Sequence, residues 1–212
     1  MGSITESFST LSEVLMADFG AHKSPGRDII SRRLVKPLLP ASFRVGMGQI
    51  IDLKDRVLGP FDIIAGWEAF PPLGEGMASQ FIADGVAFCL QVRDWKEEDL
   101  TQFAAMAGKL KALIRRTQAP LYCAVVGFDS LPANQVTEFM KSSAGQSIDG
   151  ILSVGQHLIL RNSQGWYGDP QKVRFVTEKG DGESLKGFAF WMLRIAQSFV
   201  GIPYQLADYQ HL

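Results

Sequence analysis

Two short stretches decide the fold of this chain: Gly59-Pro60-Phe61-Asp62-Ile63-Ile64 and Val86-Ala87-Phe88-Cys89-Leu90-Gln91-Val92-Arg93. Both are mostly apolar, which is typical of buried strands. Each also carries polar residues: Asp62 in the first, Gln91 and Arg93 in the second. Side chains alternate along a strand, so Gln91 and Arg93 are expected on one face. An unpaired buried charge is costly, so Asp62 is expected to have a partner, a metal or an exposed strand end.

The same alternation makes a prediction about the apolar residues of the second stretch. It places Val86 on the face of Phe88, and Ala87 on the opposite face with Cys89. Cys89 and Cys123 both lie in apolar, strand-like runs and have no Cys-x-x-Cys spacing. They are therefore expected to be reduced thiols in the core of a cytoplasmic protein.

The composition is that of a folded protein without a general affinity for polyanions. With 212 residues, 46% of them hydrophobic, one domain of ordinary size is expected. A net charge of −1 gives no overall attraction to nucleic acid, so such binding would need a local basic patch. No apolar run approaches the ~18 residues of a membrane span, and the acidic N-terminal stretch does not read as a signal peptide. We therefore expect no membrane contact.

Hydrophobic periodicity divides this expected single domain, 1–212, into three segments. They are an N-terminal helical pair (1–40), a strand-rich core (41–128) and an appended segment that ends in a helix (129–212). Strand 86–93, helix 97–116 and strand 121–128 should form a right-handed crossover between parallel strands. The strand that contains 86–93 is expected to extend over 82–95. The other expected elements are helices 4–19, 26–38, 132–141 and 185–199, strands 43–52, 61–66, 148–154 and 158–161, and edge structure at 166–167 and 173–176.

This order of elements resembles the restriction-endonuclease-like superfamily, whose signature is PD-(D/E)xK. The likeness covers residues 22–128, and more narrowly the chain is similar to an uncharacterised bacterial family of nuclease-like domains. It rests on Gly26-Arg27-Asp28, the glycine-rich strand 43–52, Asp62-Ile63-Ile64 and Gln91-Val92-Arg93. The resemblance implies an α/β fold: a mixed β-sheet flanked by helices.

The resemblance also implies a metal-dependent phosphodiesterase site. Asp62 and Gln91 would be the Mg²⁺ ligands, Asp28 would be a further acid on the helix, and Arg93 stands at the position of the signature lysine. Two of these residues depart from the pattern. Gln91 replaces the second acid and lowers the negative charge offered to the metal. Arg93 replaces a lysine, and a guanidinium stays protonated and cannot act as a base. We expect Mg²⁺ binding to be weak or absent.

Basic residues lie beside this expected site in the sequence. Arg27, Arg32 and Arg33 are candidates for phosphate contacts, although charges on a helix are often simply solvated. The polar residues of the two strands also have a purely structural interpretation. Gln91 and Arg93 could form a polar pair, with Asp62 as the buried salt-bridge partner of Arg93.

Three hypotheses for the function follow. The first is a nuclease-fold protein with a degraded metal site, catalytically weak or inactive, that acts by binding DNA, RNA or a protein partner. The second is an active Mg²⁺-dependent endonuclease of a Gln-x-Lys-like variant in which Arg93 replaces the lysine. The third is a structural or regulatory module that does not contact nucleic acid. The first is favoured, because Gln91 and Arg93 stand where the signature has an acid and a lysine.

Overall fold

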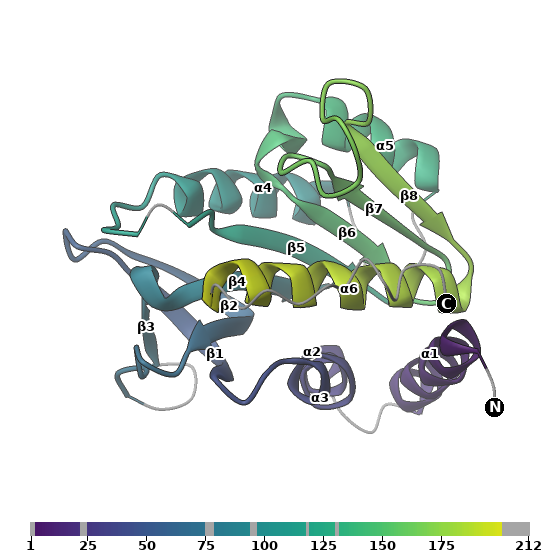
Figure 1. Ribbon diagram of the computed structural model, residues 1–212, viewed down its shortest axis with the longest axis horizontal. Coiled ribbons are helices and arrows are strands. Elements are labelled where there is room, and N and C mark those ends of the chain that lie inside the picture. Colours follow the sequence, from purple (N-terminus) through teal and green to yellow (C-terminus); the bar gives the residue numbers. More distant parts are fainter. Residues whose placement is uncertain are drawn as a thin grey trace.

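The strands of the described chain form one mixed sheet. A computed structural model describes residues 3–21, 25–74, 79–93, 97–117, 119–129 and 132–200. The eight strands lie in the order β3-β1-β2-β4-β5-β6-β7-β8 (Figure 1). Their bounds are β1 Phe43–Ile51, β2 Val57–Trp67, β3 Gln80–Ile82, β4 Val86–Val92, β5 Tyr122–Gly127, β6 Gly150–Ser153, β7 His157–Arg161 and β8 Phe175–Lys179.

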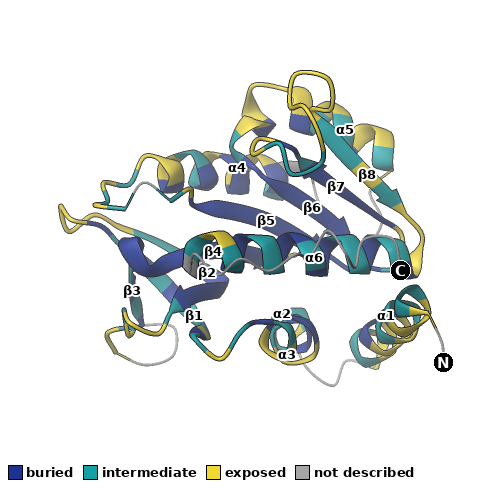
Figure 2. Ribbon diagram, viewed as in Figure 1, coloured by how far each residue is buried: buried dark blue, intermediate teal, exposed yellow. Residues whose placement is uncertain are grey.

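Helices cover both faces of this sheet. Their bounds are α1 Ile4–Gly20, α2 Gly26–Ile30, α3 Lys36–Leu38, α4 Glu97–Lys111, α5 Ala133–Lys141 and α6 Asp181–Val200. One core cluster joins the sheet to α1, α2 and α6, and a second joins it to α4 and α5. The strands between them are largely buried (Figure 2). The expected mixed α/β sheet flanked by helices is confirmed.

The expected crossover is present. β4 and β5 pair in parallel, and α4 lies between them in the sequence. β5 and β6 are also parallel. β2 is antiparallel to both of its neighbours, β1 and β4. The carboxyl ends of β4, β5 and β6 therefore meet at one edge, where polar side chains can gather without entering the core.

The strict alternation expected at the start of β4 is wrong. Val86 packs in the cluster that contains Cys89, and Ala87 packs with Phe88 in the other cluster. The cause is a bulge: the pairing of β2 with β4 shifts between Ala65 and Gly66, so Ala87 has no direct partner. An extra residue in one strand reverses the faces of those before it. Alternation resumes beyond the bulge.

Several expected boundaries also change. β2 begins at Val57 rather than at residue 61, and α4 ends at Lys111 rather than at residue 116. The strand expected over 82–95 is shorter, because Ala83–Gly85 forms a 3₁₀ turn before β4. Residues 166–167 lie in a loop, and the last strand, β8, begins only at Phe175.

The helix expected over 26–38 is continuous but irregular. α2 passes into a π-helical turn, Ser31–Val35, before α3. Ile29, Ile30, Leu34 and Val35 are buried against the sheet. A π-turn rotates the residues that follow it, and here it accompanies a packed apolar face. Among the described residues, no helix is both long and apolar enough to cross a membrane.

Candidate functional site

Three of the expected site residues meet where β2 and β4 lie side by side. Ile63 of β2 pairs with Leu90 of β4, so Asp62 and Gln91 extend this antiparallel ladder by one residue on each strand. Gln91 Nε2 donates a hydrogen bond of 2.6 Å to Asp62 Oδ2, and Arg93 Nη1 donates one of 3.1 Å to the same oxygen. The structure thus brings Asp62, Gln91 and Arg93 together, and we call these three residues the strand cluster.

The hydrogen bonds of the strand cluster are unevenly distributed. Asp62 Oδ2 accepts a third bond, 2.9 Å, from the backbone N–H of Val92, whereas Asp62 Oδ1 accepts none within the described chain. Arg93 Nη1 also donates to the carbonyl of Val92 at 3.1 Å. Gln91 is only 3% exposed, and its Oε1 is buried with no partner among the described residues. One carboxylate oxygen is thus saturated, and one amide oxygen is left unpaired.

The arrangement of these donors does not fit a divalent metal ion. Mg²⁺ requires several oxygen ligands in an octahedral geometry. The Arg93 guanidinium and the Gln91 amide nitrogen both contact the carboxylate oxygen that such an ion would share. Within the described chain, no three His, Cys, Asp or Glu side chains are grouped closely enough to hold a metal. The strand cluster supplies a single carboxylate and places a permanent cation against it.

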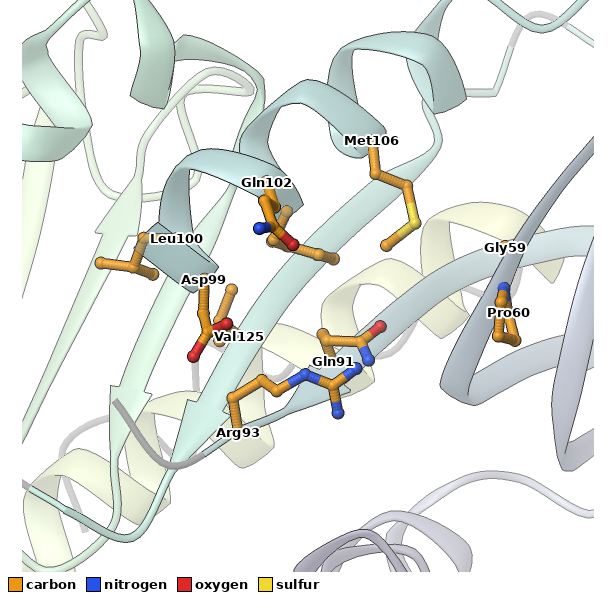
Figure 3. A pocket seen from close by; sticks show the side chains of 10 residues that line it. Gly59, Pro60, Gln91, Arg93, Asp99, Leu100, Gln102, Met106 and Val125 are labelled. Carbon is orange, nitrogen blue, oxygen red and sulfur yellow. The ribbon is translucent and has the colours of Figure 1, made fainter. Parts of the chain in front are cut away.

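Two cavities flank the strand cluster. The first, about 250 Å³, lies on the side of α2 and is lined by Arg27, Asp62 and Arg93 together with apolar residues. The second, about 280 Å³, lies between β4 and α4 and is lined by Gln91 and Arg93 (Figure 3). Arg93 borders both, and its side chain is 48% exposed. A ligand in either cavity would meet the same guanidinium.

The other expected site residues lie apart from the strand cluster. Asp28 is on α2; its carboxylate is 3.9 Å from Arg27 Nε and it does not line the cavity that contains Asp62. Arg33 is paired with Asp18 of α1 at 3.1 Å. Arg32 is exposed on the π-turn. His22, which precedes α2 in the sequence, and Ser130, which precedes α5, lie outside the described residues.

Sequence reasoning missed the residues of α4 that face the strand cluster. Asp99, Gln102 and Met106 line the cavity beside Gln91 and project toward β4 (Figure 3). Their spacing, with Phe103 between them, follows the i, i+3, i+4, i+7 rule for one helix face. The available signal was two polar residues, Asp99 and Gln102, at helical spacing from the buried Phe103.

Comparison with known proteins identifies the fold. No protein-family model and no curated protein sequence matches the chain. Among solved structures, NucC of E. coli MS115-1 in its cAAA-bound form matches with a TM-score of 0.76 and 15% identity, covering 100% of this chain and 97% of that one. NucC of P. aeruginosa ATCC27853, also cAAA-bound, matches with a TM-score of 0.77 and 11% identity, covering 100% and 98%.

The apo form of the E. coli protein gives the same result, with a TM-score of 0.74, 14% identity and coverage of 99% and 98%. The match extends over the N-terminal helices and the strands after β5 as well as the core. At this level of identity it concerns the fold alone. The chain is therefore similar in fold to NucC over its whole length.

Proposed function

We propose that this chain is a nuclease-fold protein that binds nucleic acid and cleaves it slowly or not at all. The observation that carries the proposal is the 3.1 Å contact between Arg93 Nη1 and Asp62 Oδ2. In a metal-dependent site of this type, that carboxylate is a ligand of the catalytic ion. Here its bonding oxygen is occupied by a side-chain cation.

The identity of the cation matters as much as its position. A lysine at this place can shift its pKa and position a water molecule, whereas a guanidinium remains protonated and cannot take a proton from water. Gln91 donates its amide nitrogen, rather than an oxygen ligand, to Asp62. The chain therefore lacks both a second ligand charge and a base at the signature positions.

Two arginines support a nucleic-acid ligand. Arg27 and Arg93 line the cavity beside Asp62, and guanidinium groups suit phosphate oxygens because they can donate two parallel hydrogen bonds. Arg27 Nε is buried without a hydrogen-bond partner in the described chain. The solved structures that match this fold are of NucC, two of them in the cAAA-bound form. Loss of the metal chemistry leaves phosphate contacts of this kind intact.

A protein partner is the second candidate. Leu53, Val57 and Ile114 are large apolar residues that are 47%, 45% and 39% exposed. Leu53 and Ile114 are adjacent, since the backbone N–H of Leu53 donates to the carbonyl of Ile114 at 3.2 Å. Exposed apolar residues gathered in one place favour a protein contact, and the net charge of −1 favours no general attraction to polyanions.

A combined cleavage and binding assay tests the proposal. The protein is incubated with plasmid DNA, single-stranded DNA and RNA, with Mg²⁺ or Mn²⁺, and binding is measured at several salt concentrations. We expect salt-dependent binding and no Asp62-dependent cleavage. Arg27→Gln and Arg93→Gln should weaken binding, whereas Arg44→Gln, a change of an exposed arginine on β1, should not.

Two results would overturn the proposal. Cleavage that Asp62→Ala abolishes would show a working metal-dependent nuclease in which Arg93 replaces the lysine. Absence of binding to every nucleic acid, even at low salt, would leave the protein-interaction module.

A further inference from the structure

The cavity between β4 and α4 contains an unpaired hydrogen-bond acceptor. Gln91 Oε1 is buried, and no described group donates to it. It points away from the Arg93 guanidinium, toward the side of Met106 and Pro60 (Figure 3). Leaving a buried acceptor without a hydrogen bond destabilises the site. A ligand that brings a donor to this oxygen would offset this destabilisation.

The orientation of the Gln91 amide is fixed by Asp62. Gln91 Nε2 donates to Asp62 Oδ2 at 2.6 Å, a charge-assisted bond. Rotating the amide would place Oε1 against the carboxylate, where two acceptors repel each other. The cavity therefore presents Gln91 Oε1 as an acceptor. A ligand carbonyl oxygen at this point would be repelled, because both oxygens are acceptors.

The remaining walls are apolar and suit a flat ring. Leu100, Phe103 and Met106 of α4 face the cavity, and Pro60 closes the opposite side. Methionine adapts its shape and its sulfur makes favourable contacts with aromatic rings. The volume of about 280 Å³ is at the lower end of the range for small-molecule sites.

The mouth of the cavity carries charged groups of both signs. Arg93 uses Nη1 for Asp62 and Val92, and no other group of the described residues accepts a hydrogen bond from its half-exposed guanidinium. Asp99, on the first turns of α4, is a second acceptor at the same mouth. An occupant with amino donors and an anionic group matches this combination.

We propose that this cavity binds a nucleotide whose base carries an amino group, as adenine and cytosine do. The amino group donates to Gln91 Oε1, the ring lies between Pro60 and Met106, and the phosphate contacts Arg93. The inference rests on the proposed function and deepens it, because it names the feature of a nucleic acid that the protein selects. The nucleotide is either free or an unpaired residue of a single strand.

Calorimetry with mononucleotides tests the inference. AMP and CMP carry the amino group, whereas IMP and UMP have a carbonyl at the corresponding position. We expect AMP and CMP to bind about tenfold more tightly than IMP and UMP, the ratio that one unmade hydrogen bond gives. Gln91→Met should remove the difference, and Gln156→Met, a change of an exposed glutamine after β6, should keep it.

A second variant covers the case in which Gln91→Met does not fold. Met106→Trp fills the cavity from a partly exposed position and should abolish binding of all four mononucleotides while the circular dichroism spectrum is unchanged. Single-stranded oligo-dC and oligo-dT then distinguish the sources of the ligand: a preference for oligo-dC indicates a base within a strand. Preference among mononucleotides alone indicates a free nucleotide.

The outcomes separate this inference from the proposed function. The inference is wrong if the four mononucleotides bind with equal affinity, or if the folded protein binds none of them. It is also wrong if polynucleotides bind without base preference, but that result leaves the proposed function standing. Selective binding of AMP and CMP by a protein that cleaves DNA, or that binds no strand, supports the cavity assignment and overturns the proposed function.

Discussion

Two buried aspartates of the same sheet hold a cation in different ways. Asp149, just before β6, uses both oxygens: Oδ1 accepts from Lys111 Nζ at 2.7 Å and Oδ2 from the backbone N–H of Cys123 at 2.8 Å. Within the described residues Asp62 accepts hydrogen bonds only through Oδ2, and its side chain lines a cavity. The cations differ as well, since Lys111 is 34% exposed and Arg93 is 48% exposed.

The difference separates a closed pair from an open one. At Asp149, burial raises the pKa of the carboxyl, and Lys111 opposes that rise, so the pair is enclosed by the protein. At Asp62, the partner is Arg93, which lines two cavities and is half-exposed to solvent. We infer that the closed pair serves the fold and that the open pair remains available to a ligand.

The largest expected effect is at the closed pair. Lys111→Met leaves the Asp149 carboxylate buried without its cation and should lower the free energy of unfolding by about 3 kcal/mol. Lys109→Met, a change of an exposed lysine on the same helix, should cost less than about 0.5 kcal/mol. Urea denaturation at neutral pH measures both. Equal effects of the two substitutions would show that Asp149 does not depend on Lys111.

A smaller effect is expected at the open pair. Arg93→Met should lower the free energy of unfolding by about 1 kcal/mol, because water screens a half-exposed pair and can replace the lost donor at Asp62. The same denaturation series measures it. A cost as large as that of Lys111→Met would mean that Asp62 and Arg93 are as enclosed as Asp149 and Lys111.

The smallest effect is expected at a surface pair. Glu183 of α6 accepts from Lys186 and from Thr5 of α1. These hydrogen bonds lower the pKa of the Glu183 carboxyl, against a smaller opposing effect of burial. A depressed folded-state pKa gives stability that is present above the unfolded value of 4.5 and lost as the pH falls. Glu183 is 43% exposed, so Glu183→Gln should cost about 0.5 kcal/mol at neutral pH.

Unfolding measured over a series of pH values checks the sign of this effect. The difference between the wild type and Glu183→Gln should shrink as the pH falls below 4.5, because the wild-type carboxyl becomes neutral as well. A difference that grows in acid would contradict the depressed pKa.

Part of this contrast was predictable from the sequence. The spacing of Gln91 and Arg93 predicts a shared face, and an aspartate in an apolar strand predicts a partner; the structure contains both features. The register that sets Asp62 against Gln91 depends on the pairing of two separate strands, which no local pattern determines. The bulge in β4, where the pairing shifts between Ala65 and Gly66, cannot be predicted from the sequence for the same reason.

Asp149 shows what a local sequence pattern leaves out. It lies just before an apolar strand, and nothing in that pattern indicates that its side chain is 4% exposed and paired with Lys111 of α4. The pairing of a buried carboxylate with a lysine of α4 depends on how the helix packs on the sheet. Sequence periodicity places Lys111 near the end of a helix but does not identify its partner.

Metal-dependent thermal stability tests the central claim most directly, which is that Gln91 and Arg93 have replaced a metal site. The melting temperature is measured with Mg²⁺ or Mn²⁺ and with chelator, for the wild type and for the double variant Gln91→Glu with Arg93→Lys. The double variant places a second carboxylate beside Asp62 and should be stabilised by the metals, because a ligand that binds only the folded state raises its stability. The wild type should show no difference between metal and chelator. A rise in the wild-type melting temperature with metal that Asp62→Ala abolishes would contradict the account.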